Sequence, residues 1–114
     1  MGRPVVHWQI DAKDPAKTQR FYGELFDWQI DANNPWNYGL VNTGGDGGIN
    51  GGIGPTQDAN RVVFFVQVDD LQGYLDKAER LGARTLMPPT EIPGAVTMAM
   101  FADLEGNHVG LVKG

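Results

Sequence analysis

The chain carries two copies of one pattern, in which an apolar strand is followed by an acidic residue that opens a helix. The first strand covers residues 5–10 and leads to Asp14, and the second covers residues 62–68 and leads to Asp70. Aspartate side chains accept hydrogen bonds from the free N–H groups of a helix's first turn, so Asp14 is interpreted as the cap of the first helix and Asp69 or Asp70 as the cap of the second. Because an internal repeat indicates architecture directly, we expect two similar units.

Further strands follow each helix. The spacing of apolar and turn-forming residues predicts helices over residues 15–26 and 70–81, and further strands over 28–31, 37–42, 49–53, 83–87, 96–102 and 108–112. Each half is therefore a β-α-β-β-β module, the first over about residues 1–57 and the second over about 58–114, within one α+β domain. A ferredoxin-like β-α-β-β-α-β domain is the alternative, but it needs two strands between the helices where we count three.

The faces of the predicted strands differ in character. Trp8, Phe64 and Val66 are expected to pack against the helices, with the alternate positions on the opposite face. One helix covers only one face of a sheet, so the other face must be covered by something else. We therefore expect a homodimer in which association closes a concave sheet surface.

Composition excludes several classes of protein. The net charge is −5 and the nine Lys and Arg residues are scattered, which argues against a nucleic-acid partner. There is no cysteine, so disulfides and thiolate metal sites are excluded. Neither a signal-peptide pattern nor an apolar run of about 18 residues is present, so we expect no membrane association and a cytoplasmic protein.

The stretch from Gly44 to Gly54 is rich in glycine. No Gly-Lys-Ser/Thr follows it and no Gly-x-Gly-x-x-Gly precedes a helix, so a phosphate-binding loop is excluded. Two interpretations stay open: a mobile hairpin whose glycines permit tight turns, or a strand without side chains that lets a ligand approach the backbone.

Several short motifs fall in the order typical of one superfamily. They are Asp14-Pro15, Phe21-Tyr22, Phe26-Asp27-Trp28, Gly51-Gly52-Ile53-Gly54-Pro55 and Phe101-Ala102-Asp103-Leu104-Glu105-Gly106-Asn107. With these motifs the chain resembles the vicinal oxygen chelate superfamily, which includes glyoxalase I, extradiol dioxygenases, and bleomycin- and fosfomycin-resistance proteins. The resemblance covers essentially the whole chain and implies a cup of paired sheets, but it leaves the function open because the superfamily spans several reactions and plain binding.

The resemblance also implies where a metal would be held: near the start of the first strand and on the last strand of each half. These positions fall at His7, Val63, Gly51 (give or take a residue) and Gly110, and only His7 can donate to a metal. We therefore expect no metal and no other cofactor. A displaced site that uses His7 with His108 is the alternative.

The inner sheet surface is the predicted ligand site. Its residues are His7, Gln9, Gly51, Val63, Phe65, Gln67, Met98, Met100, His108 and Gly110. Gln9 and Gln67 are expected to orient a polar group of the ligand, because an amide in an apolar cup needs a partner.

Three functions stay open. The first is a metal-independent protein of the bleomycin-resistance type that sequesters or senses a small organic molecule. The second is an enzyme of the same superfamily, either a lyase or dioxygenase with a displaced metal or an isomerase with His7 as general base. The third is a partner subunit whose cavity is filled.

Overall fold

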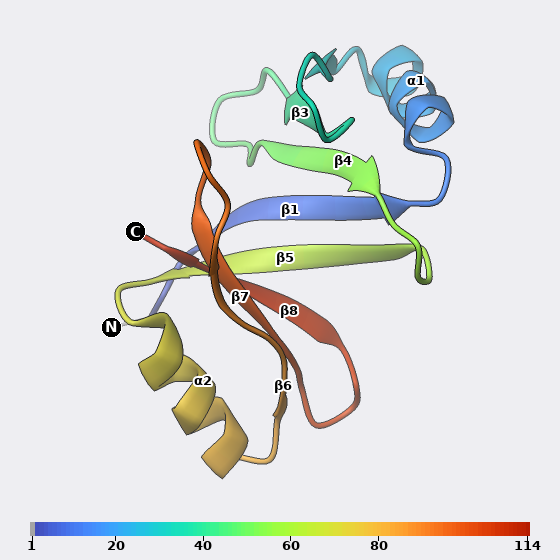
Figure 1. The fold of residues 1–114 in the computed structure, drawn as a ribbon. Helices are drawn as coiled ribbons and strands as arrows, with labels where there is room; N and C mark the ends of the chain where they lie inside the picture. The colour runs from blue at the N-terminus through green and yellow to red at the C-terminus, as the bar shows by residue number, and fades with distance from the viewer. Residues whose placement is uncertain (1) are drawn as a thin grey trace. The chain divides into compact units, whose positions relative to one another are not determined.

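The computed structural model describes residues 2–114, which form two helices and eight strands (Figure 1). The helices are α1 (Pro15–Phe26) and α2 (Leu71–Arg80), and the strands are β1 (Val5–Ala12), β2 (Gln29–Asp31), β3 (Gly39–Asn42), β4 (Gly51–Pro55), β5 (Arg61–Val68), β6 (Arg84–Glu91), β7 (Thr97–Ala102) and β8 (His108–Lys113). Every predicted element is present, in the predicted order, and the α+β class is confirmed.

The chain divides into two compact units, the first formed by residues 7–63 and the second by residues 2–6 with 64–114. The strand order is β2-β3-β4-β1 in the first half of the fold and β5-β8-β7-β6 in the second. The first strand of each half runs parallel to the last strand, β1 with β4 and β5 with β8. The two halves therefore share one topology, as the sequence repeat predicted.

The borders of the units lie a few residues from the predicted junction at 57/58. The backbone N–H of Gln67 donates to the carbonyl of Pro4 at 2.9 Å, which ties the N-terminal residues to the second unit. The N–H of Lys13 donates to Asn60 Oδ1 at 3.0 Å, which ties the segment before β5 to the first unit.

The predicted helix caps are confirmed. Asp14 Oδ1 accepts from the N–H of Lys17 at 3.2 Å, and Asp70 Oδ1 accepts from the N–H of Gly73 at 3.0 Å. The predicted stop at Gly82 is also observed, since Gly82 has a φ of 108° and follows directly after the last turn of α2. A glycine adopts this left-handed conformation without the steric cost that a Cβ would add.

Each unit has its own apolar core between its helix and its sheet. In the first unit the core consists of Ala12, Val41 and Ile53, bordered by Trp8, Ile10, Tyr22, Trp28 and Ile30. In the second unit it consists of Val68, Leu71, Leu75, Ala99 and Leu111, bordered by Val66, Tyr74 and Phe101. Since strand residues alternate between faces, the other strand positions lie on the face away from the helix, which we call the helix-free face.

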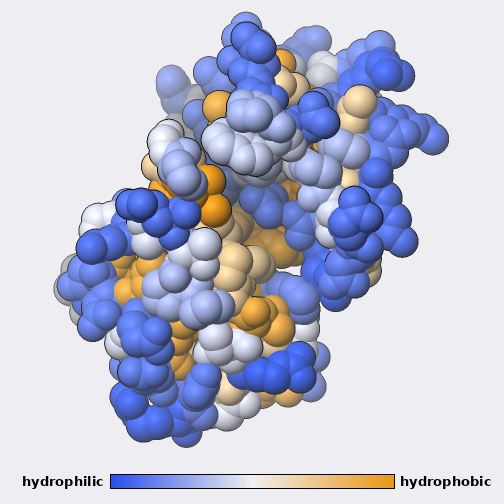
Figure 2. Space-filling view, in the orientation of Figure 1, coloured by the Kyte–Doolittle hydropathy of each residue, from blue (hydrophilic) through white to orange (hydrophobic). Residues whose placement is uncertain are grey.

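The predicted placement of Trp8 and Val66 against the helices is confirmed, but that of Phe64 is wrong. Its side chain is 46% exposed. The β5 residues that join the core of the second unit are Val66 and Val68, and α2 packs mainly on β6, β7 and β8. Phe64 therefore lies beyond the area that α2 covers. Figure 2 shows that hydrophobic residues also reach the surface at other places, among hydrophilic residues.

Neither helix of the described chain is long and apolar enough to cross a bilayer.

Leu75 and Leu81, both at α2, allow a test of the core of the second unit. Leu75 is 1% exposed, whereas Leu81 is 69% exposed at the end of the helix. We expect Leu75→Ala to lower the free energy of unfolding by about 2 to 5 kcal/mol, because it removes buried methyl groups and leaves a cavity. The control Leu81→Ala should change it by less than about 0.5 kcal/mol. Urea titration followed by circular dichroism measures both, and equal losses would contradict this assignment of the core.

Candidate functional site

Polar side chains from β1 gather on the helix-free face of the first unit. His7, Gln9 and Asp11 alternate with Trp8 and the other core residues of the same strand, and each is half-buried. Gln9 Nε2 donates to Asp11 Oδ1 at 2.7 Å. Because polar and apolar residues alternate along β1, its polar side chains form a row on the face of the strand opposite the apolar core.

Tyr38 covers the glycines of β4 on this same face. A Cβ built on Gly52 would lie 1.9 Å from Tyr38 Oη, and one built on Gly54 would lie 2.7 Å from Tyr38 Cδ1. Contacts this short are impossible for any residue other than glycine unless the ring moves. The ring therefore runs along β4 and brings its hydroxyl to His7, with Oη 2.9 Å from His7 Nε2.

Asn34 fixes the backbone of Tyr38 from both sides. Its Oδ1 accepts from the N–H of Tyr38 at 3.1 Å, and its Nδ2 donates to the carbonyl of Tyr38 at 2.6 Å. The turn that makes this possible passes through Asn37, whose φ is 54°, and asparagine tolerates this region better than most residues. The loop before β3 is therefore built to place the ring of Tyr38.

His7 and Tyr38 are both neutral near pH 7. Partial burial lowers the pKa of His7, because the charged imidazolium loses hydration. Burial, with a smaller effect from the negative charge of Asp11, raises the pKa of Tyr38 to about 12. The pair is thus a neutral imidazole hydrogen-bonded to a neutral phenol, and the histidine tautomer decides which of them donates.

A pocket of about 620 Å³ opens beside this pair in the first unit. Its lining residues are His7, Gln29, Ile30, Asp31, Leu40, Val41, Asn42, Asn50 and Gly51. It combines amide and carboxylate groups with aliphatic side chains, and its volume lies within the range of about 300 to 1,000 Å³ that small-molecule sites have.

In the second unit, Phe65 covers Gly110 much as Tyr38 covers Gly52. A Cβ on Gly110 would lie 2.3 Å from Phe65 Cδ2, and the two residues are partners across β5 and β8. Met100 is the partner of Gly110 on its other side, and Met98 and His108 follow at the alternating positions. Phe65, Met98, Met100, His108 and Gly110 thus share the helix-free face, as predicted, whereas their role in ligand binding stays a prediction.

Two other predicted site residues lie differently from expectation, and a third, Val63, is buried. Gly51 is the partner of Trp8, and a Cβ there would lie 2.2 Å from the Trp8 ring, so a side chain at this position would face the helix side, while Gly52, the partner of Gln9, has the helix-free face. Gln67 is exposed and lies next to Gly114. Val63 is only 1% exposed. The inner-face position of β4 therefore falls at Gly52, within the one-residue margin of the prediction, although Gly51 itself lines the pocket of the first unit. Gln67 is not enclosed in an apolar cup.

From the sequence, Tyr38 was expected at most at the rim of the cavity, as one of Trp28, Trp36 and Tyr38, and Asn34 was not found as part of the site. One signal for the close approach of a ring was present in the sequence. Gly52 and Gly54 are two residues apart on one strand, so one face of that strand has no side chains at either position. A strand face of this kind accommodates the close approach of another group.

The side chains of the first unit do not suit a metal ion. Within residues 2–114, no group of three or more His, Cys, Asp or Glu side chains is placed to hold one. His7 Nε2 contacts a tyrosine hydroxyl, and the facing positions of β4 are glycines under a ring. A divalent ion needs three or four converging donors, and here the donor set is too small.

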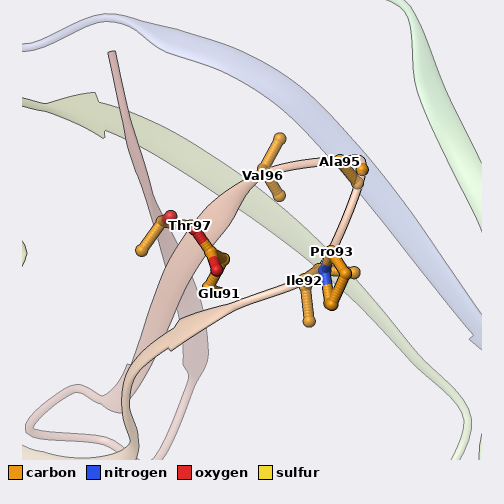
Figure 3. Close-up of a pocket in the computed structure, with 7 residues that line it drawn as sticks. Glu91, Ile92, Pro93, Ala95, Val96 and Thr97 are labelled. Atoms are coloured by element: carbon orange, nitrogen blue, oxygen red, sulfur yellow. The ribbon is translucent and has the colours of Figure 1, made fainter.

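The hairpin between β6 and β7 encloses a second, smaller hollow of about 420 Å³, formed by residues 91–97 (Figure 3). Hydrogen bonds between Ile92 and Val96 (2.7 Å) and between Ala95 and Ile92 (2.9 Å) shape the turn. None of the residues predicted for ligand binding lines it, so it belongs to the hairpin and not to the candidate site.

Solved structures with the same fold carry several functions. A glyoxalase/bleomycin resistance protein/dioxygenase superfamily member from Vibrio splendidus 12B01 matches with a TM-score of 0.69 and 12% identity, over 99% of this chain and 100% of that chain. Methylmalonyl-CoA epimerase from Mycobacterium tuberculosis matches with a TM-score of 0.69 and 12% identity, over 96% and 86%. The Mn(II)-bound glyoxalase from Novosphingobium aromaticivorans matches with a TM-score of 0.70 and 15% identity, over 99% of this chain and 40% of that one. At such low identities the likeness shows the fold alone.

No relative with a curated function matches the chain by sequence. The family comparison is decisive, because the glyoxalase-like domain family matches residues 7–112, nearly the whole chain. This chain therefore belongs to the glyoxalase-like domain family, within the vicinal oxygen chelate superfamily that its motifs resemble.

Proposed function

We propose that this protein binds a small organic molecule, without a metal ion, on the helix-free face of its first unit. The observation that carries the proposal is the pocket of about 620 Å³ beside the His7–Tyr38 pair. Gln29, Asp31 and Asn42 supply hydrogen-bonding groups and Leu40 an apolar surface, so the ligand combines polar groups with an aliphatic or aromatic part. Sequestration and sensing are both compatible with such a site.

The donor chemistry of the site supports the metal-independent form of the proposal. His7, which lines the pocket, has the neutral hydroxyl of Tyr38 as a hydrogen-bonding partner 2.9 Å from its Nε2. Hydrogen bonds in a partly buried site are strong enough to orient a ligand and select among ligands. The glycines of β4 add no side-chain donor, since they have no side chain. They leave room for the ring of Tyr38.

Metal-free enzymatic isomerisation is the second candidate, and the neutral state of His7 favours it. A neutral imidazole can accept a proton, and the phenol of Tyr38 at 2.9 Å can donate one. Epimerases are among the structures that share this fold. Incorporation of solvent deuterium into a bound carbonyl compound, lost in both His7→Gln and Tyr38→Phe, would distinguish catalysis from plain binding.

Metal-independent binding can be tested with untagged protein that has been dialysed against EDTA and equilibrated with a metabolite extract. Native mass spectrometry should show a small molecule bound to the metal-free chain, and His7→Ala should lose at least about tenfold in occupancy through the loss of one polar contact. The melting temperature should stay within about one degree on EDTA treatment, since a structural metal would contribute several kcal/mol.

The matched control is His108→Ala, in the second unit. It should leave binding unchanged. Binding that depends on His108 and not on His7 would place the site on the second unit, and binding that EDTA abolishes would contradict the proposal.

The environment of Tyr38 predicts that its hydroxyl loses its proton only at an unusually high pH, which we call the late transition. Absorbance at the tyrosinate band, with circular dichroism followed in parallel, should show a transition near pH 12 in the folded chain, because burial and Asp11 both oppose the anion. Tyr38→Phe should remove this transition, and the control Tyr74→Phe should retain it. If Tyr38→Phe leaves the late transition in place, the hydroxyl is not buried beside His7.

The cover that Tyr38 forms over β4 can be tested by a double-mutant cycle. Gly52→Ala should destabilise the chain by about 1 to 3 kcal/mol, because its Cβ forces the ring of Tyr38 away. In a Tyr38→Ala background the same change should cost far less. Gly45→Ala is the control, since a Cβ there meets nothing within 4 Å. Equal costs of Gly52→Ala in both backgrounds, from chemical denaturation, would show that the ring does not lie over Gly52.

A further inference from the structure

The three methionines that the structure describes lie close together on one face of the second unit. Met87 in β6 is the partner of Met100 in β7, and Met98 is two residues from Met100 on the same strand. Paired residues, and residues two apart on a strand, share a face of the sheet. Ala99, between the two methionines of β7, belongs to the core under α2. The three methionines therefore lie on the helix-free face of this unit.

Packing in the apolar core does not explain this methionine cluster. None of its three residues belongs to the core of the second unit, and each of them is half-buried. A thioether is apolar enough for such a position, but its sulfur is also a soft donor for metal ions. The chain has four methionines in all, and three of them fall within residues 87–100. What the three share on this face is therefore the sulfur atom and not a place in the core.

The spacing of the methionine cluster suits one ion held between its side chains. Directly paired residues of antiparallel strands have Cβ atoms about 4.5 to 5.5 Å apart, which applies to Met87 and Met100. Residues two apart on a strand, such as Met98 and Met100, are separated by about 6.5 Å. The methionine sulfur lies two bonds beyond Cβ on an unbranched, flexible side chain. The three sulfurs can therefore converge on one point above the sheet without a movement of the backbone.

The donors at this position favour a soft ion over a hard one. The neighbours of the methionine cluster on β8 are Gly110 and Val112, which add no side-chain donor. His108 pairs with Ala102, two positions further along the strands, so the thioethers are the closer set of donors. Thioether sulfur selects Cu(I), whereas hard ions such as Mg²⁺, Ca²⁺ and Mn²⁺ prefer carboxylates, carbonyls and water.

We propose that the helix-free face of the second unit binds one Cu(I) ion through the thioether sulfurs of Met87, Met98 and Met100. This site is independent of the ligand site proposed in the first unit. It also differs from the four positions at which the superfamily resemblance places a metal, because none of the three methionines is among them. The half-buried position of the side chains limits the access of water, which competes poorly with sulfur for a soft ion.

Ag⁺ is the probe for this site, because it has the charge and the ligand preference of Cu(I) but is not oxidised in air. Titration calorimetry of the full chain in chloride-free buffer should show one Ag⁺ bound per chain. In protein labelled at its methionine methyl carbons, three methyl signals should shift together during the same titration. Cu(I) supplied with ascorbate under anaerobic conditions should displace the Ag⁺, and excess Zn²⁺ should not, because thioethers bind it poorly.

Leucine variants test the donors one at a time. Met87→Leu, Met98→Leu and Met100→Leu should each weaken Ag⁺ binding at least about tenfold, since loss of even an outer partner of a metal site costs 10- to 100-fold. Leucine nearly conserves the side-chain volume, so these variants should fold, as circular dichroism can verify. The matched control is Leu86→Ala, which changes the residue next to Met87 and should bind Ag⁺ like the parent.

Four results would each overturn the proposal. They are a parent chain that binds no Ag⁺, methionine methyl signals that do not shift when Ag⁺ binds, displacement of Ag⁺ by Zn²⁺, and a triple leucine variant that binds as tightly as the parent. The methyl signals are measured on the parent chain, so this part of the test does not depend on the folding of any variant.

Discussion

In each unit of this protein an aromatic ring lies directly over a glycine of the last strand, and the candidate site depends on this steric fit. Tyr38 lies over Gly52 in the first unit and Phe65 over Gly110 in the second. A single methyl group at either glycine would overlap the ring, so ring and glycine require each other. A strand position without a side chain leaves the space into which such a ring fits in a close-packed interior.

This fit determines the chemistry of the first unit. The Tyr38 ring reaches along β4 until its hydroxyl meets His7, and burial keeps both groups uncharged near pH 7. A neutral imidazole and a neutral phenol can bind polar groups of a ligand or exchange a proton, but they offer a divalent ion one nitrogen donor and few partners. Members of a superfamily can keep one fold while the residues at a few positions exchange metal chemistry for hydrogen bonding, since function resides in the site and not in the fold.

The two sides of helix α1 differ in character. The sheet side of α1 is held to β2 and β4 by Gln19, Tyr22 and the Trp28 contact, and it secures the strands that carry the candidate site. The outer side combines exposed apolar residues with charges that its own dipole does not favour.

The sequence by itself determined the repeat, the order of the elements, the helix caps at Asp14 and Asp70 and the stop at Gly82. These features depend on residues near one another in the chain, where side-chain period and capping chemistry act directly. It also determined which residues of one strand share a face, as for Phe65 in β5 and for Met98 and Met100 in β7, because alternation within a strand is local.

The tertiary structure alone decided how distant strands are matched. Backbone pairing places Gly51 beside Trp8 and Gly52 beside Gln9, and a shift of one residue exchanges the two faces of a strand. It also decided that Asn34 places Tyr38 over that strand and that Phe64 lies outside the area covered by α2. Each of these depends on contacts between residues far apart in the chain, and neither hydrophobic period nor local propensity contains that information.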